Sequence, residues 1–268
     1  MGFPISHSLS PVIHQQFAAQ TGQEISYEAI KVRPESFDQA VENFFHAGGQ
    51  GVNCTVPLKE LAFKKADQLT ERAKFSGAVN TLKLMEDGSL LGDNTDGIGL
   101  MTDLCKNLGL SLAGKRLLVL GAGGAARGIL GPLLETQPEC LFLANRTIEK
   151  AQKLKAIFAP LGNINVSTYG DLLGEKFDLI INATSASLSG KVPPLPHDIL
   201  AKQATCYDLA YSKKPTAFTL WGTDEGALLS VGGLGMLIEQ AAQAFYIWRS
   251  VMPDTQSVVN KINTADGH

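Results

Sequence analysis

Residues 117–126, LLVLGAGGAA, decide the fold. An apolar run, Leu117 to Leu120, precedes a glycine-rich turn and a helix-forming segment, which predicts strand, tight turn and helix. In the pattern G-x-G-x-x-G/A the first glycine makes the turn and the second lets the backbone approach a pyrophosphate. A small third residue, here Ala126, permits close helix packing, and the helix N-terminus binds phosphate. The stretch therefore predicts a dinucleotide-binding unit.

The next apolar run bears on which dinucleotide is bound. Residues 140–144 lead into Asn145, Arg146 and Thr147, about where an acidic residue would bind the ribose 2′-hydroxyl of NAD. Neither Asp nor Glu stands there. Arg146, with these amide and hydroxyl neighbours and with Lys150 one turn on, suits a 2′-phosphate because guanidinium makes paired hydrogen bonds to phosphate oxygens. We therefore expect NADP rather than NAD.

From Lys115 onward the chain alternates strands and helices in the manner of a parallel sheet. The expected strands are 117–120, 140–144, 165–168, 179–182 and 205–209, and the expected helices run to about 134, over 148–158 and over 216–225. This order predicts a doubly wound, Rossmann-type α/β domain. The polar residues 182–185 end a central strand, at the edge of the sheet where a nicotinamide ribose would lie.

The first part of the chain predicts a second α/β arrangement. Ser10 and Pro11 have the chemistry of an N-cap and a first helical turn, with Gly22 as the stop. Further elements are expected as strands at 25–32 and 51–56, helices at 37–45, 60–69 and 98–108, a hairpin of 79–85 with 90–91, and a last helix at 236–248.

Several polar residues in this part have two interpretations on local evidence. Ser8 and Ser10 could be plain helix caps, and Lys59 a solvated surface group, although it stands where a strand ends and a helix begins. Asp93 and Asp96 could form an Asx turn and an N-cap, or bind a metal, although no third ligand cluster supports a metal.

Composition sets the broad class of the protein. With 268 residues, 44% of them hydrophobic, the chain is long enough for two domains with cores of their own. A net charge of -3 gives no global attraction to nucleic acid or membrane. We expect a cytoplasmic protein, because no signal peptide or membrane span is evident. The four cysteines are spaced as reduced core residues: Cys54, Cys105, Cys140 and Cys206.

Seven motifs, in order along nearly the whole chain, resemble the shikimate dehydrogenase family. They are Ser8-x-Ser10-Pro11, Asn53-Cys54-Thr55-Val56-Pro57-x-Lys59, Gly77-Ala78-Val79-Asn80-Thr81, Gly92-Asp93-Asn94-Thr95-Asp96-Gly97, Gly121-Ala122-Gly123-Gly124-Ala125, Asn145-Arg146-Thr147 and Gly233-Leu234-Gly235-Met236. The resemblance implies a substrate domain, residues 1–96 and 233–268, and an NADP domain, residues 97–232. It also implies reversible reduction of 3-dehydroshikimate to shikimate on the pathway to aromatic amino acids.

The resemblance also implies roles for individual residues. Lys59 and Asp96 match the catalytic pair. The substrate contacts, which include that pair, are matched by Ser8, Ser10, Thr55, Asn80, Tyr211 and Gln240. The cofactor contacts are matched by Glu71, Gly121, Ala122, Gly123, Gly124, Ala125, Asn145, Arg146, Thr147, Lys150, Thr184, Leu209 and Gly233.

The reaction chemistry independently fits the Lys59 and Asp96 pair. Hydride delivered to a ketone carbon leaves charge on oxygen, which needs a cationic proton donor, and an adjacent carboxylate can orient that ammonium. The hydroxyls and amides suit a small polyol acid. Ser8 and Ser10, close to the helix that begins near Pro11, could bind its carboxylate.

Two departures from the family pattern leave alternatives open. Only Met1 precedes Gly2, where family members carry a short strand whose loss would cost ladder hydrogen bonds, so we expect either a misplaced start or a weakened domain. Gly232 stands where an acid is common, and could loosen the loop near the nicotinamide. The alternatives are a quinate/shikimate dehydrogenase with relaxed specificity and a non-catalytic NADP-binding regulator. A homodimer is compatible with the sequence.

Overall fold

The structure, a computed structural model, describes residues 1–212 and 214–265 and divides into two compact units. Unit 1 comprises Met1–Leu100 and the chain from Leu237 onward, and unit 2 comprises Met101–Met236. The chain therefore leaves unit 1 once and returns to it once.

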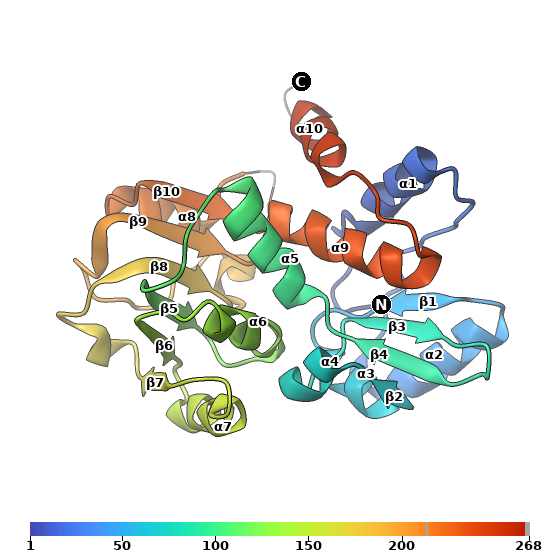
Figure 1. Ribbon diagram of the computed structural model, residues 1–268, viewed down its shortest axis with the longest axis horizontal. Helices are drawn as coiled ribbons and strands as arrows, with labels where there is room; N and C mark the ends of the chain where they lie inside the picture. The colour runs from blue at the N-terminus through green and yellow to red at the C-terminus, as the bar shows by residue number, and fades with distance from the viewer. Residues whose placement is uncertain (213, 266–268) are drawn as a thin grey trace. The chain divides into compact units, whose positions relative to one another are not determined.

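Unit 2 is built on a six-stranded parallel sheet whose strands lie in the order β10-β9-β8-β5-β6-β7 (Figure 1). The strands are β5 (Arg116–Leu120), β6 (Cys140–Ala144), β7 (Ile164–Ser167), β8 (Phe177–Asn182), β9 (Leu200–Asp208) and β10 (Leu229–Gly232). The strand order reverses beside β5, which is the Rossmann arrangement and places a ligand crevice at the carboxyl ends of the strands there. The predicted fold class is confirmed.

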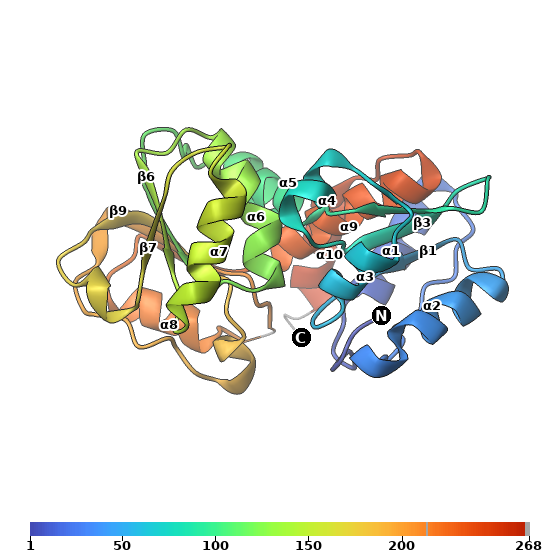
Figure 2. The same ribbon diagram turned by 90° about the horizontal axis from the view of Figure 1, so that it is seen from below.

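The apolar runs of unit 2 form its core. Residues 117–120 are fully buried in the centre of the sheet. The helices are α6 (Gly124–Glu135), α7 (Ile148–Phe158) and α8 (Ala217–Asp224), and α6 and α7 lie side by side (Figure 2). Ala126 is fully buried, as expected of the small residue that lets α6 pack closely. Strand β10 was not predicted, because its four residues are half-buried and carry no clear alternation.

Unit 1 contains a four-stranded sheet in the order β1-β3-β4-β2 (Figure 1). Its strands are β1 (Gly51–Asn53), β2 (Gln68–Leu69), β3 (Thr81–Leu84) and β4 (Leu90–Asp93). Its helices are α1 (Ser10–Thr21), α2 (Phe37–His46), α3 (Lys59–Lys65), α4 (Glu71–Ser76), α9 (Leu234–Arg249) and α10 (Thr255–Ala265), while α5 (Asp96–Thr102) leads out of the unit. Helices α2 and α3 pack their apolar residues on one face of the sheet, and α1 and α9 lie on the other (Figure 1).

Three expectations for unit 1 are wrong. The expected strand 25–32 is extended but forms only one bridge, between Lys31 and Gly2, because no neighbouring strand among the described residues completes a ladder along it. The expected helix 60–69 ends at Lys65, because residues 68–69 pair with β4 instead. The N-cap of α1 is Leu9, and Ser10 is already helical.

Two further expectations need correction. The helix expected over 98–108 begins at Asp96, ends at Thr102 and continues as a π-helix over Asp103–Asn107. The four cysteines are free thiols, but they are not all core residues: Cys105 is exposed and Cys140 is half-buried.

A buried histidine lies among aromatic rings where α1 packs against α9. The imidazole of His14 is fully buried and stacks on the ring of Tyr27, with 4.2 Å between the two ring centroids. The rings of Phe17, Phe245 and Trp248 complete this aromatic cluster. Among the described residues, neither ring nitrogen of His14 has a partner at hydrogen-bond geometry. Burial lowers the pKa of His14 from 6.5 to about 3, and the neighbouring Asn53 side chain opposes that shift to a smaller extent.

In the described ranges, no helix is long and apolar enough to cross a membrane. Those same ranges hold no group of three or more His, Cys, Asp or Glu side chains able to bind a metal ion.

Candidate active site

The predicted catalytic pair is an ion pair in unit 1. The Lys59 ammonium donates to Asp96 Oδ2, and the two side chains are only 12% and 6% exposed. Lys59 is the first residue of α3 and Asp96 the first of α5, so each is held at the start of a helix. The Lys59 carbonyl accepts from the Val79 N–H at 2.9 Å, which fixes the start of α3 beside the residues that precede β3.

Asn80 joins this pair to α9. Its side-chain amide donates to Asp96 Oδ1 at 2.8 Å and lies 3.3 Å from Gln240 Oε1. The structure therefore brings together four residues that were predicted separately, from four regions of the sequence. The Gln240 side chain is held in place at both ends, because its oxygen lies beside Asn80 and its nitrogen donates to the Leu237 carbonyl at 2.8 Å.

Thr95 is a site residue that the sequence analysis missed. It is fully buried, accepts from Asn80 Nδ2 at 2.8 Å, and its backbone N–H donates to Asn80 Oδ1 at 2.9 Å. These bonds set the orientation of the Asn80 amide, so that its N–H groups face Asp96 and Gln240. In the sequence, Thr95 is marked only by its membership of the motif that runs from Gly92 to Gly97.

Asp93 supports the loop rather than the pair. Its two carboxylate oxygens accept from Arg72 Nε and the terminal guanidinium nitrogen, each at 2.6 Å, and Oδ1 also accepts from Thr70 at 2.7 Å. This geometry is the paired fork that arginine makes with a carboxylate. Asp93 therefore anchors the loop before Asp96 to α4, and the Asx-turn interpretation applies instead to Asn94, whose Oδ1 accepts from the Asp96 N–H at 3.1 Å.

The other predicted substrate residues of unit 1 lie near the starts of α1 and α3. Ser8 and Ser10 are half-buried, and Ser8 Oγ accepts from the Ser10 N–H at 3.3 Å. Thr55 follows β1, and its carbonyl accepts from the Leu58 N–H at 2.8 Å in the turn before Lys59. Tyr211 belongs to unit 2, in the segment after β9.

The glycine-rich turn of unit 2 has the backbone of a phosphate cradle. Gly121 has a φ of +99°, and a Cβ there would lie 3.2 Å from the Ala183 carbonyl oxygen, so only glycine fits without strain. Gly123 is the exposed N-cap of α6, and a Cβ built on it would meet nothing within 4 Å. As a glycine, Gly123 has no side chain that could cap this helix, which leaves the first N–H groups of α6 to an anion.

The segment after β6 presents the predicted 2′-phosphate residues. Arg146, Thr147 and Lys150 are exposed, and Asn145 Nδ2 donates to the Thr147 carbonyl at 2.7 Å, which shapes the turn. Tyr169, which was not predicted as a site residue, lies beside Arg146. Burial raises the pKa of Tyr169, and the Arg146 charge opposes that shift.

A buried polar network holds the carboxyl ends of β8 and β9 together. Asn182 and Asp208 are fully buried, and Asn182 Nδ2 donates to Asp208 Oδ1 at 3.1 Å. Asp208 Oδ2 accepts from the hydroxyls of Ser187 and Thr216, each at 2.6 Å. Thr184 Oγ1 donates to Asn182 Oδ1 at 2.7 Å. The network therefore rigidifies the strand ends that carry Thr184 and Leu209, two of the predicted cofactor contacts.

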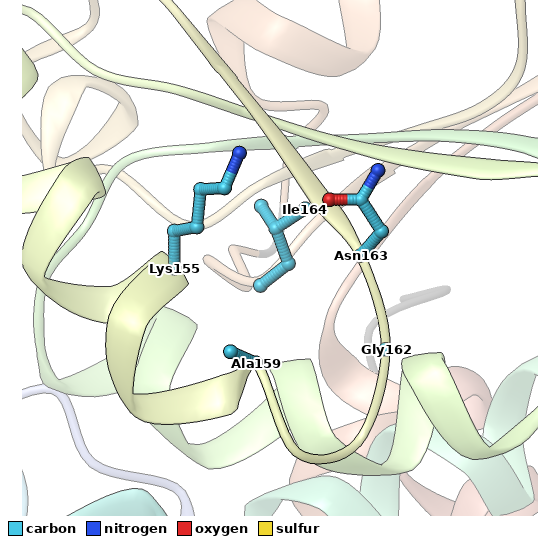
Figure 3. Close-up of a pocket in the computed structure, with 5 residues that line it drawn as sticks. All are labelled: Lys155, Ala159, Gly162, Asn163 and Ile164. Carbon is cyan, nitrogen blue, oxygen red and sulfur yellow. The ribbon is translucent and has the colours of Figure 1, made fainter.

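The remaining features are Glu71 in unit 1 and a hollow in unit 2. Glu71, a predicted cofactor residue, is the first residue of α4 in unit 1, where its carboxylate is 79% exposed and pairs with Lys74 at 2.7 Å. A hollow of about 310 Å³ lies at the opposite, amino-terminal end of β7 (Figure 3). Its lining contains one charged side chain, the exposed Lys155, so it offers no constellation for catalysis.

Family models cover most of the chain. Residues 1–82 match the model of the shikimate dehydrogenase substrate binding domain, and residues 103–189 match the shikimate / quinate 5-dehydrogenase model. Residues 233–261 match the shikimate 5′-dehydrogenase C-terminal domain. The chain is 55% identical over 261 residues to a shikimate dehydrogenase (NADP(+)) of Methylococcus capsulatus, covering 97% of this chain and 94% of that protein. The chain belongs to the shikimate dehydrogenase family.

Solved structures agree with this family assignment. The Ael1 enzyme from Pseudomonas putida is 44% identical, with a TM-score of 0.87, over 97% of this chain and 95% of that one. The shikimate 5-dehydrogenase of Thermus thermophilus, solved with NADP(H) and shikimate, is 34% identical, with a TM-score of 0.84, over 95% and 94% of the two chains. The resemblance inferred from the seven motifs is thus confirmed.

Proposed function

We propose that this chain catalyses the reversible NADP-dependent reduction of 3-dehydroshikimate to shikimate, in the cytoplasm, as a step of aromatic amino acid biosynthesis. The observation that carries this proposal is the Lys59 and Asp96 ion pair, joined through Asn80 to Gln240, in a member of this family. Substrate binding is assigned to residues 1–96 and 233–268 and NADP binding to residues 97–232.

The proton chemistry follows from the ion pair. When bound, NADPH supplies the hydride that reaches the ketone carbon of 3-dehydroshikimate. Charge then develops on the carbonyl oxygen, and the Lys59 ammonium protonates that oxygen; in the oxidation direction the Lys59 amine accepts the same proton. Asp96 holds the Lys59 ammonium through Oδ2, while Asn80 holds Oδ1, so the donor is fixed before substrate binds.

The surrounding polar groups account for the substrate class. Asn80, Thr55 and Gln240 are amide and hydroxyl groups suited to a ring that carries several hydroxyls, and an analogue that lacks one leaves such a group unpaired. Ser8 and Ser10 stand at the N-terminus of the twelve-residue helix α1, whose dipole favours a carboxylate there. A small hydroxylated acid satisfies both requirements.

The residues of unit 2 fit NADP. The uncapped N-terminus of α6 and the open side of Gly123 accommodate a pyrophosphate, and Arg146 with Lys150 supplies positive charge for the 2′-phosphate. Glu71 remains a proposed cofactor contact on the strength of the resemblance alone.

The assay for the proposed function is the initial rate of NADPH formation from shikimate and NADP⁺, with quinate and NAD⁺ as parallel substitutions. We expect turnover with shikimate and NADP⁺, and a much lower kcat/KM when either is replaced. Comparable rates with quinate would support the relaxed-specificity alternative. Binding of NADP⁺ without turnover of shikimate or quinate would support a non-catalytic regulator instead.

Replacing Arg146 by alanine tests the choice of cofactor. Charge-assisted hydrogen bonds contribute about 1.5–3 kcal/mol, so we expect the KM for NADP⁺ to rise about 10- to 100-fold, with little change in kcat/KM for NAD⁺. The matched control is Lys153→Ala, which removes an exposed cation from α7 outside the proposed set. Equal losses with NADP⁺ and NAD⁺ would mean that Arg146 supports the turn rather than recognises the phosphate.

A further inference from the structure

A buried carboxylate in unit 2 has no part in the chemistry described above. Asp103 is 5% exposed and is the first residue of the π-helix that follows α5. Its Oδ2 accepts from the Tyr207 hydroxyl at 2.6 Å, and its Oδ1 accepts from Asn107 Nδ2 at 2.9 Å. π-helical segments are rare and occur frequently at functional sites. A buried charge with two dedicated donors in such a segment calls for a specific role.

Tyr207 connects Asp103 to α9. Its side chain is fully buried on β9, and its hydroxyl oxygen accepts from the backbone N–H of Met236 at 3.3 Å, in the first turn of α9. Burial and the Asp103 charge raise the pKa of Tyr207 well above its ordinary value. The phenol therefore stays protonated and donates to Asp103. The partly positive N-terminus of this sixteen-residue helix also favours a carboxylate nearby.

The segment before Met236 packs closely against Asp103 and against the carboxyl end of β9. A Cβ built on Gly235 would collide with the Asp103 carboxylate. A Cβ on Gly233 would lie 2.6 Å from the Leu209 carbonyl oxygen and 2.9 Å from that of Asp208. The Gly233 N–H also donates to the Ala210 carbonyl at 3.0 Å. Both glycines are thus required by close approach, and the segment 232–236 is fixed on the carboxyl end of β9.

We propose that Asp103 is a positioning residue for the nicotinamide half of the cofactor. Through Tyr207 and the first turn of α9 it holds the backbone at Gly233 on the carboxyl end of β9, the edge of the sheet where the nicotinamide half of a dinucleotide lies in this fold. This inference rests on the proposed function, because Gly233 is there a cofactor contact. Asp103 touches neither substrate nor cofactor and acts through the segment 232–236.

The test separates the two halves of the cofactor. Adenosine 2′,5′-bisphosphate carries the adenosine and 2′-phosphate without the nicotinamide, so its Kd reports only on the region of α6, Arg146 and Lys150. In Tyr207→Phe and Asp103→Ala we expect this Kd to stay within about twofold, while the NADPH Kd rises and kcat falls about tenfold or more, since a misplacement of about 1 Å can cost a hundredfold. Asp103→Asn keeps the shape and one acceptor, so we expect it to retain more activity than Asp103→Ala.

The matched control lies at the opposite end of the same sheet. Asp178, at the amino end of β8, accepts from the Arg116 N–H at 2.9 Å and from Lys115 at 3.1 Å, so Asp178→Asn weakens unit 2 away from the proposed site. We expect it to lower Tm and leave kcat unchanged. Variants of Asp103 and Tyr207 that lower Tm but keep the wild-type kcat and NADPH Kd would overturn the proposal.

The outcome for the proposed function is read separately, on the wild-type protein. If wild type does not turn over shikimate, the proposed function fails, but the ratio of the bisphosphate Kd to the NADPH Kd still measures what the nicotinamide half contributes to binding. A fall of that ratio in Tyr207→Phe would then support the positioning role. An unchanged ratio would overturn it.

Discussion

Removing the Lys59 ammonium should lower kcat by about 10²- to 10⁴-fold, the range that a positioned acid–base group contributes. The variant to make is Lys59→Met, which keeps the apolar stem of the side chain and deletes only its charge. The reason is that, in the oxidation of shikimate, the reacting hydroxyl loses the group that accepts its proton, while Asp96 keeps the hydrogen bond from Asn80 and therefore stays in place. The measurement is kcat and KM for shikimate at saturating NADP⁺, with NADP⁺ binding measured in parallel.

The chain offers a control on the same helix. Lys65, at the end of α3, is ion-paired with Glu42 at 2.5 Å and is 24% exposed, so Lys65→Met deletes a paired lysine at the other end of the helix. We expect this control to keep its kcat, because exposed ion pairs contribute little. Near-normal turnover in Lys59→Met, with Tm and NADP⁺ binding intact, would refute the proposed role of Lys59.

Asp96→Asn should separate orientation from charge. The asparagine retains an oxygen that can accept from Asn80, but it no longer stabilises the Lys59 ammonium by charge. Its kcat should fall less than that of Lys59→Met if Asp96 only orients the donor. An equal or larger fall would mean that the carboxylate itself contacts the reacting hydroxyl.

The Rossmann-type unit was predictable because its signal is local. Buried parallel strands read as short apolar runs, and the turn at Gly121 needs a positive φ that glycine supplies, so sequence and structure agree closely from β5 to α7. Unit 1 was harder to predict. The end of α3 depends on the pairing of residues 68–69 with β4, and the extended segment 25–32 lacks a partner for most of its length. Both facts are long-range and leave no local pattern.

The candidate active site was likewise predictable only in part. The motif residues Lys59, Asp96 and Asn80 were found through the resemblance, and the structure shows them bonded to one another. Thr95 and Asp103 were missed, because a buried hydroxyl and a buried carboxylate differ from ordinary surface residues only in what surrounds them.

Acid should destabilise unit 1 through His14. In the folded protein its pKa is about 3, against 6.5 for the free side chain, because the aromatic cluster excludes water from the imidazole. Between these values the unfolded chain binds a proton that the folded chain does not. Stability therefore falls as the pH drops below 6.5, by about 1.4 kcal/mol for each pH unit. The contribution lost by about pH 3 approaches ~5 kcal/mol, which is a large part of the stability of an ordinary domain.

The substitution that removes this dependence is His14→Phe. A phenyl ring can replace the imidazole in the stack on Tyr27, and it brings no nitrogen that needs a partner. We therefore expect the free energy of unfolding of His14→Phe to exceed that of wild type by an amount that grows from pH 7 to pH 4. The difference between the two proteins cancels the carboxylates, which also titrate over the acid part of this range.

Urea unfolding followed by the fluorescence of Trp248 measures the effect in the right unit. Trp248 contacts His14, whereas Trp221 lies in α8 of unit 2, so both proteins should carry Trp221→Phe. His46→Gln, at the exposed end of α2, is the control that removes a histidine outside the cluster, and it should follow wild type at every pH. A constant difference between His14→Phe and wild type from pH 7 to pH 4 would show that His14 is not the titrating group. The aromatic cluster would then contribute packing alone.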